Sequence, residues 1–155
     1  MADTPRHPID PQHPVDPDTG PSPRSVAQGP VVVAVAVGGV IGAMARYGAG
    51  RTWHDAPAAF PWTTLLINVL GCALIGVLMV LVTERGPAHP LVRPLLGTGV
   101  LGGFTTFSTY TVDLQRELAH DRWGQAACYG GLTVAGALAA VAAATVATRT
   151  LAVRA

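Results

Sequence analysis

Polar side chains recur at four-residue spacing inside two long apolar segments of the sequence. Thr64, Asn68 and Cys72 follow one another in steps of four, and Tyr129 and Thr133 have the same spacing in a later segment. Residues four apart lie on one face of a helix. Hydroxyl and amide groups inside apolar surroundings need either a partner or a water-filled path. The spacing therefore predicts a lane of hydrogen-bond donors along packed helices.

A third segment combines glycines with a dense run of hydroxyl residues. Gly102 and Gly103 are followed by Phe104-Thr105-Thr106-Phe107-Ser108-Thr109-Tyr110-Thr111. Glycine and hydroxyl residues are poor formers of a continuous helix. A break here would free backbone carbonyls, which a membrane tolerates only where they face a cavity or an ion. The run thus predicts a helix that is broken near its middle.

Small and hydroxyl residues also have a purely structural interpretation. They are common where transmembrane helices pack, because small side chains allow close approach and hydroxyls bond to the carbonyl four residues earlier. Gly38-xxx-Gly42 and Gly99-xxx-Gly103 fit this packing pattern. Taken one at a time, most of these residues are explained by packing. The glycine and hydroxyl run of the third segment is the exception.

Two charged residues stand at the edges of the apolar segments. Arg46 either extends to the lipid headgroups or supplies positive potential at a mouth for an anion. Asp113 is expected to cap or end the third segment. The first, second and fourth segments contain no acidic residue. Carriers coupled to protons or cations usually need a carboxylate within the membrane, so this absence argues against such carriers.

The segments that must position these residues are long, apolar and closely spaced. Charged residues make up 12% of the chain, about half the roughly 25% that is usual in soluble domains. Crossing a membrane takes about 20 predominantly apolar residues. The sequence therefore predicts an all-α integral membrane protein of four transmembrane helices, the third broken. The expected helices cover residues 31–50, 63–83, 92–112 and 125–148.

The remaining sequence forms a polar tail and short connections. Residues 1–30 hold most of the 13 prolines, so this tail is expected to be disordered, ahead of a membrane domain over residues 31–150. Because the connections are short, successive helices are expected to be antiparallel neighbours. Arginines flank both membrane faces in similar numbers, which favours neither orientation strongly.

Three stretches at matching spacing resemble the signatures of the CrcB/Fluc family of fluoride channels. They are Gly38–Tyr47, Phe60–Gly71 and Gly102–Tyr110, and the resemblance covers about residues 31–148. It implies an antiparallel, dual-topology dimer in a bacterial cell membrane, formed by two copies or by this chain and a related subunit. The implied function is passive, fluoride-specific conduction that exports fluoride from the cytoplasm and lowers its toxicity.

The resemblance also implies roles for individual residues. Asn68 corresponds to the pore amide of the family, and Phe107 and Tyr110 to the aromatic pair beside each pore, although the family more often has Phe at the second place. The fourth-helix polar track often continues with another hydroxyl where this chain has Ala137. The remaining residues expected to contact fluoride are Ser108, Tyr129, Thr133 and Arg46.

A sodium ion is the one cofactor that the resemblance implies. In the family it lies at the dimer interface and is held by backbone carbonyls of the two broken third helices. The matching carbonyls here belong to Gly102 and Thr105. Asp113 resembles an acidic residue near one pore mouth, shortened here from Glu.

Two other classes of membrane protein compete with the channel. A small four-helix multidrug exporter has similar size but depends on a first-helix glutamate, which this chain lacks. A non-conducting membrane subunit would use the same polar residues only to hold helices together. An enzyme is not indicated, because the apolar segments contain no nucleophile–base pair and no metal-ligand cluster.

Overall fold

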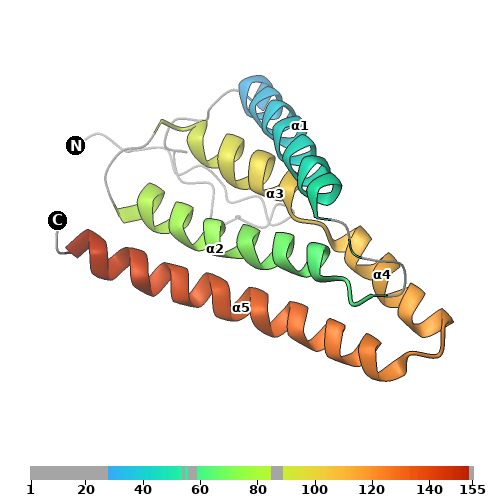
Figure 1. The fold of residues 1–155 in the computed structure, drawn as a ribbon. Coiled ribbons are helices and arrows are strands. Elements are labelled where there is room, and N and C mark those ends of the chain that lie inside the picture. Colours follow the sequence, from blue (N-terminus) through green and yellow to red (C-terminus); the bar gives the residue numbers. More distant parts are fainter. Residues whose placement is uncertain (1–27, 54, 56–58, 85–88, 154–155) are drawn as a thin grey trace, which may run out of the picture.

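The computed structural model describes residues 28–53, 55, 59–84 and 89–153. All regular elements in these ranges are helical, as Figure 1 shows. Most of the tail expected to be disordered, residues 1–27, lies outside the described residues. The elements are α1 (Gln28–Thr52), α2 (Trp62–Glu84), the π-helix η1 (Arg93–Leu101), α3 (Gly102–Phe104), α4 (Phe107–Ala119) and α5 (Trp123–Val153).

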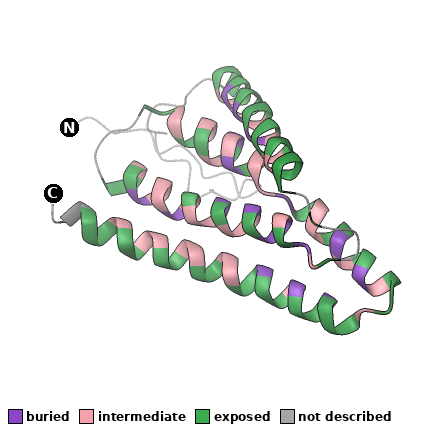
Figure 2. Ribbon diagram, viewed as in Figure 1, coloured by how far each residue is buried: buried purple, intermediate pink, exposed green. Residues whose placement is uncertain are grey.

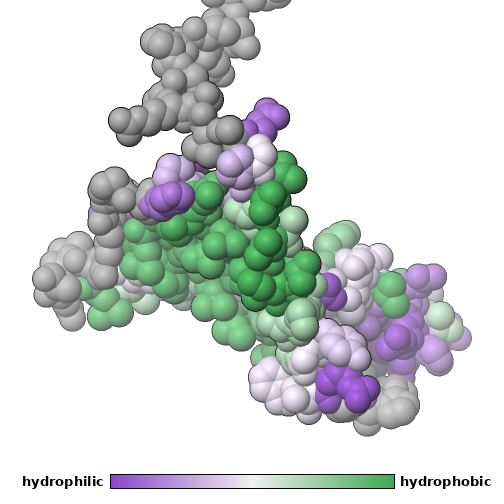
Figure 3. Space-filling model, turned by 90° about the horizontal axis from the view of Figure 1, so that it is seen from above, coloured by the Kyte–Doolittle hydropathy of each residue, from purple (hydrophilic) through white to green (hydrophobic). Residues whose placement is uncertain are grey.

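Three helices, α1, α2 and α5, are long and apolar enough to cross a membrane by length and composition. They coincide with the expected helices 31–50, 63–83 and 125–148 and extend a few residues past them. Large apolar side chains are exposed along most of their length, as the green ribbon of Figure 2 indicates. Figure 3 shows a broad apolar face with hydrophilic side chains toward its ends. The chain is therefore a multi-pass helical membrane protein.

The first helix begins earlier than expected. The tail was expected to extend through residue 30, but α1 starts at Gln28 and includes Pro30 in its first turn. Proline is tolerated there, because the first amide groups of a helix have no intrahelical partner.

The third apolar segment, expected as a broken helix over residues 92–112, is divided into the pieces η1, α3 and α4. η1 and α3 end at Phe104, and Thr105 (φ −75°, ψ 158°) and Thr106 (φ −147°, ψ 121°) are extended before α4 begins. None of these pieces qualifies as a membrane span by itself. Residues Thr105 and Thr106 are called the break below.

The expected end of this segment at residue 112 is wrong, because α4 continues to Ala119. Two acidic residues beyond residue 112, Asp113 and Glu117, are buried in α4 and paired. Asp113 accepts a hydrogen bond from Thr64, and Glu117 forms a 2.8 Å ion pair with Arg122. A paired carboxylate can be buried in a helix where an unpaired one would be too costly.

Successive segments run antiparallel, as Figure 1 shows, but the closest neighbours are not successive. The most extensive contacts join α1 to η1 and α2 to α5, whereas α1 and α2 meet only slightly. Successive helices are therefore antiparallel neighbours, but they are not the main packing partners. Glycines decide the pairing, because they let backbones approach where larger side chains cannot.

A glycine seam joins α1 to η1 and α3. It consists of Gly38 and Gly42 on one side and Gly99 and Gly103 on the other. A Cβ atom on Gly99 would lie 2.9 Å from the Cα of Gly38, and one on Gly103 would lie 2.5 Å from the Gly39 carbonyl. A Cβ on Gly42 would meet the Val100 carbonyl. The two small-xxx-small motifs therefore pack against each other.

Candidate functional site

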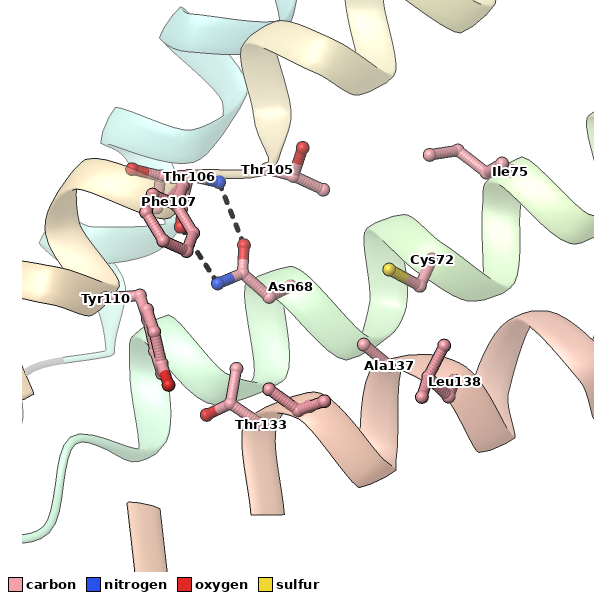
Figure 4. Close-up of a pocket in the computed structure, with 11 residues that line it drawn as sticks. Asn68, Cys72, Ile75, Thr105, Thr106, Phe107, Tyr110, Thr133, Ala137 and Leu138 are labelled. Atoms are coloured by element: carbon pink, nitrogen blue, oxygen red, sulfur yellow. Dashed lines mark hydrogen bonds between the residues drawn. The ribbon is translucent and has the colours of Figure 1, made fainter. Parts of the chain in front are cut away.

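The break lies against an open groove of about 330 Å³, called the donor groove. Four residues that the sequence pointed to, Asn68, Phe107, Tyr110 and Thr133, come together there from three helices (Figure 4). The groove is completed by Cys72 and Ile75 of α2, Thr105 and Thr106 of the break, and Val134, Ala137 and Leu138 of α5.

Asn68 connects α2 to the break through both atoms of its amide. Its Oδ1 accepts from the Thr106 backbone N–H at 2.8 Å, and its Nδ2 donates to the Thr106 carbonyl at 3.0 Å. These bonds set the orientation of the amide, since only its oxygen can accept from the N–H group. One Nδ2 hydrogen is used, so the second remains available to a ligand. Figure 4 shows both bonds.

The hydroxyl groups around the break mostly bond to one another. The Thr106 Oγ1 caps α4 by accepting from the Thr109 amide at 3.1 Å, and it lies 3.2 Å from the Ser108 hydroxyl. Ser108 is exposed and does not line the donor groove. The side chain of Thr105 does line it, with its hydroxyl bonded to the Leu101 carbonyl at 2.9 Å.

Aromatic rings form a continuous series from the groove into the protein. The ring centroids of Phe107 and Tyr110 are 5.6 Å apart, those of Tyr110 and Tyr129 are 5.3 Å apart, and Phe60 packs edge-on against Tyr129. Phe107 is 79% exposed, whereas Tyr129 is fully buried. The structure therefore places Tyr129 behind the groove, in contact with Tyr110.

The two polar lanes of the sequence meet at Asp113, which is buried. Thr64 of α2 donates to its carboxylate at 2.7 Å, and the Tyr129 hydroxyl of α5 lies at 3.5 Å from the same oxygen. The Thr133 hydroxyl donates within its own helix, to the Tyr129 carbonyl at 2.8 Å. Asp113 thereby links α2, α4 and α5.

Arg46 lies apart from the donor groove. It lines a second groove of about 440 Å³ with residues of α1, α2, the break and α4. Its Nε donates to the carbonyl of Gly103 at 3.2 Å. Thr106 lines both grooves, so they lie on either side of the break.

The backbone carbonyls of Gly102 and Thr105 lack their usual helical donors. The amide of Thr106, four residues after Gly102, bonds to Asn68 instead. The amide of Thr109, four residues after Thr105, bonds to the Thr106 hydroxyl. Among the residues that the structure describes, no group of three or more His, Cys, Asp or Glu side chains could hold a metal. Carbonyl oxygens are hard donors of the kind that suit a hard cation.

Sequence reasoning missed Thr106 as an individual residue, although it lay within the hydroxyl run. Its backbone bonds to Asn68 and its side chain caps α4. A threonine immediately before a helix is a usual N-cap, and this was the available signal. The signal is recognisable only once the start of α4 is known.

Comparison with known proteins places these residues in a family. The model of the family described as CrcB-like protein, Camphor Resistance (CrcB), matches residues 33–145. The chain is 59% identical over 97 residues to the fluoride-specific ion channel FluC 2 of Streptomyces avermitilis, covering 61% of this chain and 61% of that relative. The FluC 1 channel of Streptomyces coelicolor is 54% identical over 114 residues, 74% of each chain.

Two further relatives extend this pattern. The fluoride-specific ion channel FluC 2 of Thermobifida fusca is 52% identical over 122 residues, 79% of this chain and 90% of the relative. Streptomyces avermitilis also has a FluC 3 channel, which is 46% identical over 97 residues, 63% of this chain and 48% of the relative. One organism can therefore hold more than one member.

Proposed function

The chain belongs to the CrcB-like protein family, and we propose on this premise that it is a fluoride-specific ion channel rather than an enzyme. It conducts fluoride passively out of the cytoplasm across the bacterial cell membrane, which lowers fluoride toxicity. The observation that carries the proposal is the Asn68 amide, which bonds to the break and shares a groove with Phe107 and Tyr110.

Fluoride crosses a membrane only where hydrogen-bond donors replace its hydration shell. The second Nδ2 hydrogen of Asn68 is one such donor, and the positive ring edge of Phe107 offers a weaker contact. Thr133 contributes if its hydroxyl turns from the Tyr129 carbonyl toward the groove. Ser108, beside the break, donates once its hydroxyl turns from Thr106. Selectivity then rests on the width of the path and the placement of these donors.

Tyr129 and Arg46 have less direct roles in this proposal. The buried Tyr129 supports the ring of Tyr110 and donates toward Asp113. Arg46 adds positive potential in the second groove, which lies on the other side of the break. Both residues therefore shape the path and its field, while the donor groove holds the closest contacts to the ion.

The fourth membrane crossing in this proposal is the interrupted segment formed by η1, α3 and α4. It runs in the same direction as α1 and antiparallel to α2 and α5 (Figure 1). Non-helical backbone inside a membrane needs polar partners. The bonds from Asn68 to Thr106 supply them, which makes an interruption at this depth tolerable.

The functional unit of the proposal is an antiparallel, dual-topology dimer with two pores. Support comes from the exposed apolar residues of α1, such as Met44 at 69%, and from Phe107 at 79% exposure beside an open groove. A second subunit would cover these surfaces. The partner is a second copy or a related subunit, and the two Streptomyces avermitilis relatives make the latter reasonable.

A sodium ion at the dimer interface is part of the same proposal. The carbonyls of Gly102 and Thr105 suit this role, because the amides that would occupy them in a helix bond elsewhere. Four carbonyls, two from each subunit, would surround a monovalent cation. The ion would counter the negative ends of these dipoles and hold the two breaks together.

Fluoride efflux from liposomes tests the channel directly. The purified protein should release fluoride rapidly and chloride slowly. Asn68→Ala removes the donor and both bonds to the break, and Phe107→Ile removes the ring edge; each should abolish most of the flux. Val146→Ile, an exposed position of α5 outside the donor groove, is the matched control and should leave it unchanged.

The alternatives predict different results. A non-conducting subunit would release no fluoride, even after co-reconstitution with a related subunit. An exporter would need a driving ion gradient, whereas the channel conducts down the fluoride gradient alone. α1 contains no acidic residue to couple such a gradient.

A further inference from the structure

One face of α1 carries Gly38, Gly42 and Arg46 in steps of four. The two glycines belong to the glycine seam, where α1 touches the backbone of η1 and α3. Arg46 is therefore placed one turn beyond the seam, at the level where α3 ends. Because the backbones are already in contact, a side chain at this position meets the end of α3 directly.

The end of α3 leaves a carbonyl that Arg46 satisfies. In a continuous helix the Gly103 carbonyl would accept from the amide of Phe107. The helix stops at Phe104, and Phe107 begins α4 on the other side of the extended break. The Arg46 Nε–H supplies a donor instead, at 3.2 Å.

The break is thus held from two sides by side chains of other helices. Asn68 of α2 bonds to Thr106, and Arg46 of α1 bonds to Gly103. Only two residues, Phe104 and Thr105, separate the two attachment points along the chain. The donor groove and the Gly102 and Thr105 carbonyls all depend on the conformation of this short stretch.

We propose that Arg46 is a positioning residue that sets the conformation of the break through its Nε–H group, and that conduction depends on this donor more than on the positive charge. The flux part of this inference rests on the proposed channel function. The structural part rests only on the bond to Gly103.

Two substitutions separate the hydrogen bond from the charge. Arg46→Gln removes the charge but retains an N–H donor, because Gln Nε2 stands the same number of bonds from Cα as Arg Nε. Arg46→Met has similar length and no donor. Loss of the donor to this partly buried carbonyl is expected to shift the local equilibrium by about tenfold or more.

We therefore expect the Met variant to lose fluoride flux about tenfold or more, and the Gln variant to retain clearly more flux than the Met variant. Hydrogen–deuterium exchange of the protein in nanodiscs gives a second readout. The Thr105, Thr106 and Thr109 amides, all bonded in the structure, should exchange faster in the Met variant than in the Gln variant.

Equal loss of flux in both variants, with unchanged exchange at these amides, would overturn the proposal and assign Arg46 an electrostatic role. Equal exchange in wild type and both variants would overturn the structural part by itself. If wild type conducts no fluoride, the channel function fails, yet faster exchange in the Met variant still supports the bond to Gly103.

Discussion

The Asn68 side chain pairs with backbone groups that a neighbouring strand would otherwise satisfy. Its amide bonds to both the N–H and the carbonyl of Thr106, so an extended residue inside an apolar bundle has its backbone groups satisfied. The same amide retains a donor for a ligand. Structural and functional demands therefore fall on one residue, and a substitution there affects both.

The residue scale also includes the buried carboxylate of Asp113. Thr64→Val removes its 2.7 Å donor while preserving side-chain shape. The carboxylate oxygen then keeps only the 3.5 Å contact with the Tyr129 hydroxyl. A poorly satisfied buried acceptor costs about 1–3 kcal/mol, so the midpoint of thermal unfolding in detergent should fall. Thr83→Val in the same helix is the control, because the exposed Thr83 hydroxyl bonds only to its own helix. Equal midpoints for the two variants would contradict a supporting role for Thr64.

At the scale of elements, the glycine seam determines which helices pair. α1 packs on η1 because neither backbone carries side chains at the contact. Since α3 follows η1 directly, the seam also places the break relative to Arg46. The position of the break is therefore set by the packing of α1 against η1 and α3.

Gly42→Ala tests the seam. The added methyl group would meet the Val100 carbonyl and lie 2.8 Å from the Phe104 amide nitrogen, so α1 and α3 must separate. Overpacking of this kind costs about 1–3 kcal/mol, and both stability and fluoride flux should fall. Gly48→Ala in the same helix meets nothing within 4 Å and should be neutral. If the two variants melt and conduct alike, the seam does not position the break.

At the scale of the whole molecule, aromatic anchors gather where α1 ends and α2 and α5 begin. Trp53, Trp62 and Trp123 are all more than half exposed there. Tryptophan favours the boundary between membrane and water. In the proposed antiparallel dimer, each membrane face receives one such set, so a subunit need not prefer one orientation.

The proposed sodium ion leads to a prediction for the assembled dimer. Replacing sodium by N-methyl-D-glucamine at equal ionic strength should lower the dimer fraction and its melting temperature, because opposed carbonyl dipoles lose their cation. At a sodium concentration a hundred times its dissociation constant, sodium binding would stabilise the dimer by about 2.7 kcal/mol. Light scattering after size exclusion measures the dimer. If the dimer fraction and melting temperature are the same with either cation, the dimer does not contain the proposed sodium ion.

The sequence predicts the long helices well and the polar contacts less well. Long apolar runs locate α1, α2 and α5 because membrane thickness sets their length. The end of α4 was misplaced, since burial of Asp113 depends on Thr64, 49 positions away. Four-residue spacing put Tyr129 on a polar face but could not show that Phe60 and Tyr110 cover it.

The π-helical winding of η1 has a consequence for how this segment can vary among related chains. In a π-helix each carbonyl accepts from the amide five residues later, so a turn contains more residues than a turn of α-helix. A one-residue deletion between Arg93 and Leu101 could therefore be absorbed by rewinding toward an α-helix. The break would keep its place while the chain changed length, so this segment tolerates a shortening that a tightly wound helix could not.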